Sequence, residues 1–105
     1  MPKAYVLLQF NVTDAETFGQ DRRGAAPTIV ANGGRVLVAA NQGDVREGAL
    51  PASLATIIEF PSHEAAETWY GSSEYKAVHH LRPDATSEGS LVFLDGFEPP
   101  AGPKP

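Results

Sequence analysis

The sequence has no cysteine, so disulfide bonds, thiolate metal sites and cysteine nucleophiles are all excluded. It also has no continuous apolar run approaching the roughly 20 residues that a membrane-spanning helix requires. The first residues, Met1 to Ala4, lead directly into an apolar segment, without the basic region and apolar stretch of a secretory signal. From these absences we expect a cytoplasmic protein.

Basic residues are scarce as well. The 105 residues contain 8 Lys and Arg against 13 Asp and Glu, which gives a formal net charge of −5. Nucleic acid and anionic membrane surfaces are therefore not expected as partners. The chain has neither a GxGxxG nor a GxxxxGKS/T pattern, so no phosphate loop is predicted. A chain of this length forms one domain, expected over residues 4–97, and the proline-rich residues 98–105 are expected to form a flexible tail.

Four segments have the composition of strands, and a helical pattern follows the first of them. Alternating or continuous runs of apolar and β-branched residues predict strands at residues 4–12, 35–40, 53–60 and 90–97. The first helix is expected to begin at a capping box formed by Thr13 and Glu16 and to end near Ala31. Gly24 and Pro27 are expected to weaken or kink this helix.

A second helical segment, between the third and fourth strands, is expected in two parts. Ser62 is suited to cap the first part, and Gly71 is suited to end it. Ser73 is suited to cap the second part, which Pro83 closes because the residue before a proline avoids the α conformation. Along one stripe of this second part lie the side chains at i, i+3, i+4 and i+7, namely Tyr75, Val78, His79 and Arg82.

The element order is therefore βαββαβ, which predicts an α+β sandwich. Two helices cover one face of a four-stranded antiparallel sheet, and the first strand lies between the third and the fourth. Both faces of the first strand are apolar, because Val6, Leu8 and Phe10 alternate with Tyr5 and Leu7. Leaving in water the face that the helices do not cover would be costly at ~25 cal/mol per Å². We therefore predict a homodimer in which a second copy covers the face that the helices leave open.

Three polar residues interrupt the apolar strands. Gln9, Glu59 and Asp95 lie on strands that we expect to be adjacent, and a buried carboxylate must be paired, hydrogen-bonded or neutralised. They would form the polar floor of a pocket if the helices cover the face that bears Tyr5 and Leu7, which is the orientation we favour. The alternative is that Glu59 and Asp95 lie at strand ends near water.

His79 and Arg82 are the candidate catalytic residues. His79 shares a helical face with Tyr75, where it could act as an acid, a base or a hydrogen-bond donor. The alternative is a half-buried histidine that is satisfied by a backbone carbonyl. Arg82 could bind a carboxylate or enolate through its guanidinium, or it could form a structural ion pair with one of the acidic residues Glu59, Glu74 and Asp95.

The aromatic residues Trp69, Tyr70 and Tyr75 have two interpretations. They are core or dimer-contact residues, or they form a pocket wall against a flat organic ligand, in which case Trp69 and Tyr75 would contact the substrate. The histidines offer no metal site, because the adjacent side chains of His79 and His80 diverge by ~100° around a helix whereas metal ligands converge.

The sequence also resembles a known family at points along most of its length. The matching segments are Asp14 to Glu16, Gly33 to Arg35, Glu47-Gly48, Ile58 to Ser62, Ala65-Ala66, Trp69-Tyr70, Ser73 to Tyr75 and Leu81-Arg82. The pattern is similar to that of small bacterial proteins known only as a domain of unknown function within the dimeric α/β-barrel superfamily. It covers roughly residues 4 to 97 and implies a ferredoxin-like fold that forms a homodimeric α/β barrel.

This superfamily includes cofactor-free monooxygenases, cyclases, isomerases and haem-degrading enzymes, and the functional expectation rests on these activities. The resemblance implies a cofactor-independent enzyme that acts on a small hydrophobic or aromatic molecule in bacterial secondary metabolism. His79 would move a proton, Arg82 would hold an oxyanion, and Glu59, Asp95 and Tyr75 would orient the ligand. The alternatives are a non-catalytic ligand-binding or stress-related homodimer, and haem binding through one of the adjacent histidines.

Two positions depart from the family pattern. Many relatives carry an arginine late in the second strand, where this chain has Ala39 and Ala40. A tyrosine that is common in the first helix is replaced by Asp21. If these positions line the family's pocket, we expect the ligand or the reaction of this protein to differ from that of its relatives.

Overall fold

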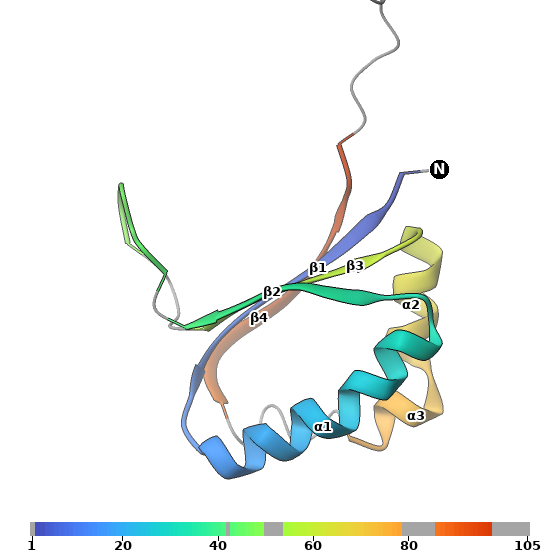
Figure 1. The fold of residues 1–105 in the computed structure, drawn as a ribbon, viewed down its shortest axis with the longest axis horizontal. Helices are drawn as coiled ribbons and strands as arrows, with labels where there is room; N and C mark the ends of the chain where they lie inside the picture. Colours follow the sequence, from blue (N-terminus) through green and yellow to red (C-terminus); the bar gives the residue numbers. More distant parts are fainter. Residues whose placement is uncertain (1, 42, 50–53, 79–85, 98–105) are drawn as a thin grey trace, which may run out of the picture.

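The structure, a computed structural model, describes residues 2–41, 43–49, 54–78 and 86–97. In chain order its elements are β1 (Ala4–Val12), α1 (Ala15–Ala31), β2 (Arg35–Asn41), β3 (Leu54–Phe60), α2 (His63–Gly71), α3 (Ser73–Lys76) and β4 (Thr86–Asp95). The strands form one antiparallel sheet in the order β2-β3-β1-β4, and the helices lie on one side of it (Figure 1). The predicted ferredoxin-like α+β fold, with the first strand between the third and the fourth, is confirmed.

The sheet is regular at its centre and irregular at its β2 edge. In the centre, Val6 of β1 lies opposite Ile58 of β3. At the edge, the register between β2 and β3 shifts between Val36 and Val38. A bulge of this kind breaks the strict alternation of a strand. As a result the neighbouring residues Leu37 and Val38 both line a groove on the side of the sheet away from the helices.

The first helix begins with a different cap from the one predicted. Asp14 has the extended backbone of an N-cap, and its Oδ1 accepts a hydrogen bond from the backbone N–H of Thr17 at 3.1 Å. The Thr17 hydroxyl donates to Oδ2 of Asp14 at 2.7 Å, and these hydrogen bonds hold the pKa of Asp14 below its ordinary value. The prediction that Thr13 caps the helix is therefore wrong. From this cap α1 continues through Gly24 and Pro27 to its predicted end.

The second helical segment divides as predicted, although its second part is shorter. Ser62 caps α2, and its Oγ accepts a hydrogen bond from the backbone N–H of Ala65 at 3.0 Å. Ser72, rather than the predicted Ser73, caps α3. α3 has 4 residues and is followed by a turn, whereas the prediction extends the helix to Arg82. The remainder of that prediction, residues 79–85, lies outside the described residues.

The helices cover the wholly apolar face of β1. Ala4 and Val6 have no exposed surface, and Phe10 is 6% exposed. The core that Ala4 and Val6 form with the other buried side chains also contains Ile29, Ile58, Phe60, Ala66, Trp69 and Tyr75. Our favoured orientation, with the helices over Tyr5 and Leu7, is therefore wrong. The face that carries Val6 offers a continuous apolar surface, and covering it removes more apolar area from water.

Two glycines allow close packing of the helical layer. A Cβ atom on Gly24 of α1 would lie 2.8 Å from Cγ1 of Val78, which follows α3. A Cβ atom on Gly34, just before β2, would lie 2.6 Å from the ring of Phe60. Both distances are too short for real side chains. Glycine at these positions therefore lets α1 approach α3 and lets the start of β2 approach β3.

The face of the sheet opposite the helices is open. Four apolar side chains on the strands are between 39% and 45% exposed there, namely Leu37, Val38, Val92 and Leu94. A contiguous apolar surface of this kind is a mark of an interaction site. Within the described ranges, no helix combines the length and apolar character needed to cross a membrane.

Trp69 supplies a test of how the helical layer is held together. It is 1% exposed, and its indole N–H donates to Oγ1 of Thr28 at 3.0 Å. Thr28→Val keeps the shape of the side chain but leaves this buried donor without its acceptor. We expect the substitution to lower the free energy of unfolding by about 1–3 kcal/mol in urea denaturation. Thr68→Val, at an exposed position of α2, is the control, and equal stability of the two variants would contradict a structural role for the hydrogen bond.

Candidate functional site

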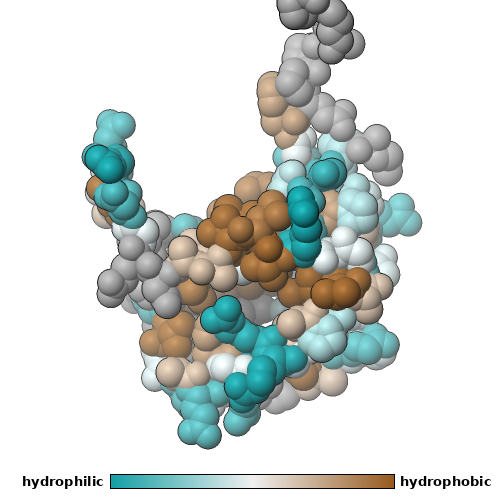
Figure 2. All heavy atoms as spheres, viewed as in Figure 1, coloured by the Kyte–Doolittle hydropathy of each residue, from teal (hydrophilic) through white to brown (hydrophobic). Residues whose placement is uncertain are grey.

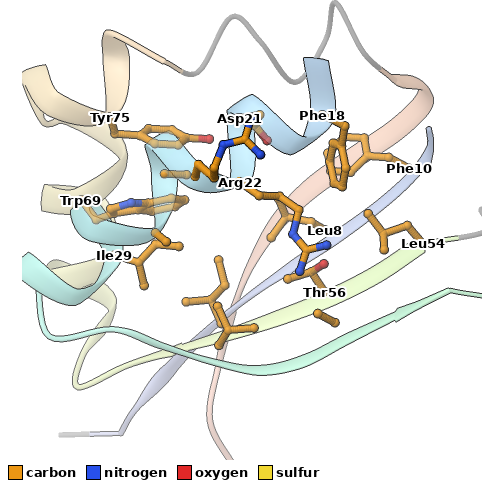
Figure 3. Close-up of a pocket in the computed structure, with 16 residues that line it drawn as sticks. Leu8, Phe10, Phe18, Asp21, Arg22, Ile29, Leu54, Thr56, Trp69 and Tyr75 are labelled. Carbon is orange, nitrogen blue, oxygen red and sulfur yellow. The ribbon is translucent and has the colours of Figure 1, made fainter. Parts of the chain in front are cut away.

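A cavity of about 390 Å³ lies between α1 and the helix-covered face of the sheet (Figure 3). Its apolar and aromatic lining comes from three strands and three helices: Leu8, Phe10, Phe18, Ala25, Ala26, Ile29, Val36, Ala39, Leu54, Ile58, Trp69 and Tyr75. Its polar lining consists of Asp21, Arg22, Arg23 and Thr56. In the space-filling view, hydrophilic side chains over α1 border a hollow beneath the hydrophobic strands (Figure 2).

Aromatic side chains stand at both ends of the cavity (Figure 3). At one end the rings of Trp69 and Tyr75 have centroids 4.3 Å apart and planes inclined at 37°. At the other end lie Phe10 and Phe18. The hydrogen bond from the indole to Thr28 fixes the orientation of Trp69. The cavity therefore has rigid aromatic ends of the kind that pack against a flat organic ring.

α1 contributes the charged groups of the cavity. Asp21 is 7% exposed, and its Oδ1 is shielded from solvent. Arg22 and Arg23 are exposed, so their guanidinium groups lie at the rim. The guanidinium carbon of Arg22 lies 6.0 Å from the ring centroid of Phe18, a cation–π distance that holds the group beside the cavity.

The groups that line the described part of the cavity indicate which ligands it could bind and which reactions it could support. A largely apolar space with a few polar groups on one side suits a small hydrophobic molecule with one or two polar substituents. The carboxylate of Asp21 and the phenol of Tyr75 are groups that hold or move protons, and guanidinium groups stabilise oxyanions. Among the described residues, no three His, Asp or Glu side chains are grouped so that they could hold a metal ion.

Two of the predicted substrate-binding residues lie in this cavity. Trp69 and Tyr75 are core aromatics and also line the cavity. That they contact a substrate stays a prediction. Tyr70 is 42% exposed and is absent from the lining that the structure describes. The predicted catalytic residues His79 and Arg82 lie outside the described residues.

Three other predicted residues lie on the open face of the sheet. Tyr5 alternates along β1 with the buried Ala4 and Val6, and it pairs with Glu59 of β3. Gln9 is on the same side as Tyr5, four residues further along the strand. These side chains therefore do not meet Tyr75 beneath the helices, and the polar floor that we expected there does not form.

Glu59 is instead the centre of a polar cluster on the open face. Its side chain is 14% exposed, and its Oε2 accepts a hydrogen bond from the Tyr5 hydroxyl at 3.2 Å. Its Oε1 lies 3.1 Å from Nε of Arg35 and 3.8 Å from Nζ of Lys3. A half-buried carboxylate of this kind is satisfied by pairing, as expected for an acid within an apolar strand.

Asp95 belongs neither to the described cavity lining nor to the polar cluster around Glu59, and it lies at the end of β4. Its Oδ1 is 3.2 Å from Nδ1 of His63, at the start of α2. The other ring nitrogen of His63, Nε2, is 3.5 Å from Oε1 of Glu67. Both carboxylates are exposed, so the alternative that Asp95 lies at a strand end near water matches the structure.

The charged residues of the cavity were not among the predicted site residues. Their signal is visible in the sequence, because Phe18, Arg22, Ala25 and Ile29 share one stripe of a helix and all four line the cavity. The same spacing is typical of a core stripe, so periodicity alone does not separate the two roles. Asp21 and Ala39, two positions where the chain departs from the family pattern, both line the cavity.

Residues 3–97 match the model of a family described as a domain of unknown function, DUF1330. Among solved structures, the chain is similar to a protein of unknown function from Rhodopseudomonas palustris, with a TM-score of 0.78. The two are 18% identical, and the similarity covers 93% of this chain and 85% of the other. No curated protein matches the chain.

Two further solved structures share the fold. One is SnoaB, a cofactor-independent oxygenase from Streptomyces nogalater, with a TM-score of 0.65 and 9% identity over 96% of this chain and 100% of that chain. The other is a dimeric ferredoxin-like protein of unknown function from Thermobifida fusca, with a TM-score of 0.60 and 10% identity over 90% of this chain and 91% of that chain. At these identities the similarity establishes the fold alone.

The polar cluster on the open face gives a prediction about the ionisation of Tyr5. Partial burial raises the pKa of Tyr5, the hydrogen bond to Glu59 and its negative charge raise the pKa further, and Arg35 acts in the opposite direction. Glu59→Gln removes the charge, so the pKa of Tyr5 should fall towards its ordinary value. The phenolate absorbance of each protein, minus that of the same protein carrying Tyr5→Phe, measures this pKa.

The sign of the accompanying stability change follows from linkage. Because the folded-state pKa of Tyr5 lies above the unfolded value, the stabilisation is complete below the unfolded pKa and is lost as pH rises through the folded pKa. Tyr5→Phe should therefore make alkaline unfolding less steep. Glu67→Gln, on the helical side, is the matched control, and an equal change of the Tyr5 pKa in both Gln variants would refute the assignment.

Proposed function

We propose that this chain, which belongs to the DUF1330 family of domains of unknown function, is a cofactor-independent enzyme that acts on a small hydrophobic or aromatic molecule. The observation that carries the proposal is the cavity of about 390 Å³ between α1 and the sheet. Its volume is in the range of small-molecule sites, which are mostly apolar with a few placed polar groups. The aromatic rings at its two ends favour a flat substrate.

The reaction that we propose is a proton transfer, cyclisation, isomerisation or oxygenation in bacterial secondary metabolism. The cavity supports this class because Asp21 and Tyr75 bring proton-handling groups to a largely apolar space, where electrostatic interactions are stronger than in water. SnoaB, whose fold is similar, is a cofactor-independent oxygenase, which supports the oxygenation branch by analogy. His79 as proton carrier and Arg82 as oxyanion holder remain part of the proposal.

The alternative is a homodimer that binds a small ligand without transforming it. The nearly continuous apolar lining favours this alternative, because only four polar residues line the described cavity. Incubation in air with small phenols and naphthols, without added cofactor, separates the two functions. Mass spectrometry that finds a changed ligand supports the enzyme, and recovery of an unchanged ligand that binds supports the alternative.

The homodimer is the second part of the proposal. The open face carries a groove of about 450 Å³ with walls that include Leu7, Ile57 and Leu94. A second copy would cover this groove sheet to sheet and remove the exposed apolar side chains from water. The protein from Thermobifida fusca, which has a similar fold and is described as dimeric, supports a dimeric state.

Filling the cavity tests the ligand site. Ala39→Trp should weaken binding of the neutral fluorescent probe N-phenyl-naphthylamine by about tenfold or more, because the indole would occupy space that the probe needs. Ala31→Trp, at the exposed end of α1, is the control. Thermal unfolding confirms that both variants fold. Unchanged probe binding by Ala39→Trp would mean that the cavity is not the ligand site.

A charge on the open face tests the dimer. We expect the natural protein to have twice the 11.2 kDa mass of one chain in light scattering, and Leu94→Asp to give the single-chain mass. The carboxylate would have to be buried between two sheets, which is strongly unfavourable. Val30→Asp, at a position of α1 that is 71% exposed, should leave the mass unchanged. A natural protein of 11.2 kDa, or a Leu94→Asp dimer, contradicts the proposal.

A further inference from the structure

We propose that the ligand of the cavity is an organic anion, namely a hydrophobic or aromatic molecule with one carboxylate or equivalent acidic group held by Arg22 and Arg23. This inference rests on the proposed function, because it names the class of molecule that the same cavity takes. Three features of the described residues carry it: the sign of the charge in the lining, the position of the two guanidinium groups, and their lack of other ionic partners.

The charge of the lining is opposite to the charge of the protein. The whole chain has a formal net charge of −5. The described lining contains two arginines and one aspartate, so its formal charge is +1. The Asp21 carboxylate can offset at most one guanidinium. A positive rim on a negative protein draws an anion to the cavity, since the remainder of the surface repels it.

The two guanidinium groups lie where a ligand inside the cavity could reach them. The ring of Phe18, itself part of the lining, lies 6.0 Å from the guanidinium carbon of Arg22. Nη1 of Arg23 lies 3.5 Å from the position of a Cβ on Gly19, so this side chain folds back along α1. The cation–π contact with the ring limits the freedom of the Arg22 side chain, which reduces the entropy lost when it binds a ligand.

Among the described residues, no acidic side chain forms an ion pair with either guanidinium. The ion pairs within the described ranges involve Lys3, Arg35, Arg46 and His63, and they do not include Arg22 or Arg23. Guanidinium binds carboxylates and enolates in a planar, bidentate geometry. Two such groups at the rim of an apolar space, between aromatic ends, match a flat molecule whose acidic group points towards α1.

A matched pair of fluorescent probes tests this inference. Anilinonaphthalene sulfonate carries an acidic group, and N-phenyl-naphthylamine has the same ring system without it. In the double variant Arg22→Gln/Arg23→Gln, we expect the sulfonate to bind about threefold to tenfold more weakly, as exposed guanidinium–anion contacts are of moderate strength. Binding of the neutral probe should change by less than about twofold, since the apolar walls are intact. Added salt should weaken binding of the sulfonate and not of the neutral probe.

Three control variants test whether charge, the position of the arginines and binding within the cavity account for the result. Arg22→Lys/Arg23→Lys keeps the charge and should retain most of the sulfonate binding. Arg46→Gln removes an exposed arginine far from the cavity lining and should change neither affinity. Ala39→Trp should weaken both probes, which locates them in the cavity.

The outcomes separate this inference from the function on which it rests. An equal loss for both probes in the Arg22→Gln/Arg23→Gln variant, or no loss for the sulfonate, overturns the anion preference and leaves the cavity as a site for neutral molecules. If neither probe binds the natural protein, or if Ala39→Trp binds both as well as the natural protein does, the proposed function fails together with the inference.

Discussion

The rest of the structure depends on one constraint: the central strand is apolar on both faces, and helices cover only one of them. The face that carries Val6 is buried under α1, α2 and α3, and it supplies the core. The face that carries Leu7 remains open beside the exposed Leu94 of β4. A single copy therefore covers one apolar face of its sheet with helices, and the open face has the character of an interface.

Trp69 determines how the helical layer sits on this sheet. Its ring contacts Phe60 of β3 and Tyr75 of α3, and its N–H is bonded to Thr28 of α1. These contacts hold the C-terminal half of α1 close to the core, where Ile29 is buried. The side of α1 that carries Phe18, Arg22 and Ile29 also lines the cavity, beside this packed cluster. The site that we propose is thus a consequence of where the large aromatic residues are packed and where they are not.

The polar groups of the protein are divided between the two faces of the sheet, and the division separates their roles. Glu59 is satisfied on the open face by Tyr5 and Arg35, so it belongs to the surface that would meet a second copy. Asp21 and its neighbouring arginines border the cavity on the helical side. An apolar cavity with charges along one wall can orient a ligand, because only one end of the ligand finds polar partners.

Much of the secondary structure could be predicted from the sequence alone, because it depends on local interactions. Hydrophobic alternation predicted the four strands, although β4 is Thr86–Asp95 and not residues 90–97, and Ser62 marked the start of α2. Caps and periodicity depend on neighbours in the chain. The element order then led to the predicted sheet order. The choice of Thr13 over Asp14 as a cap was wrong by one residue, since either side chain can accept the hydrogen bond and only the backbone geometry separates them.

Only the tertiary structure decided which face of the sheet the helices cover. The period of a strand places Val6 and Tyr5 on opposite sides, yet both sides are apolar, so the pattern does not say which side is the inner one. That choice arises from contacts between residues far apart in the sequence, such as those of Trp69 with Thr28 and Phe60. The cavity, too, depends on the spacing between α1 and the sheet, which no local pattern encodes. For this reason the sequence did not identify Arg22 as a lining residue, and it drew attention to Asp21 only as a departure from the family pattern.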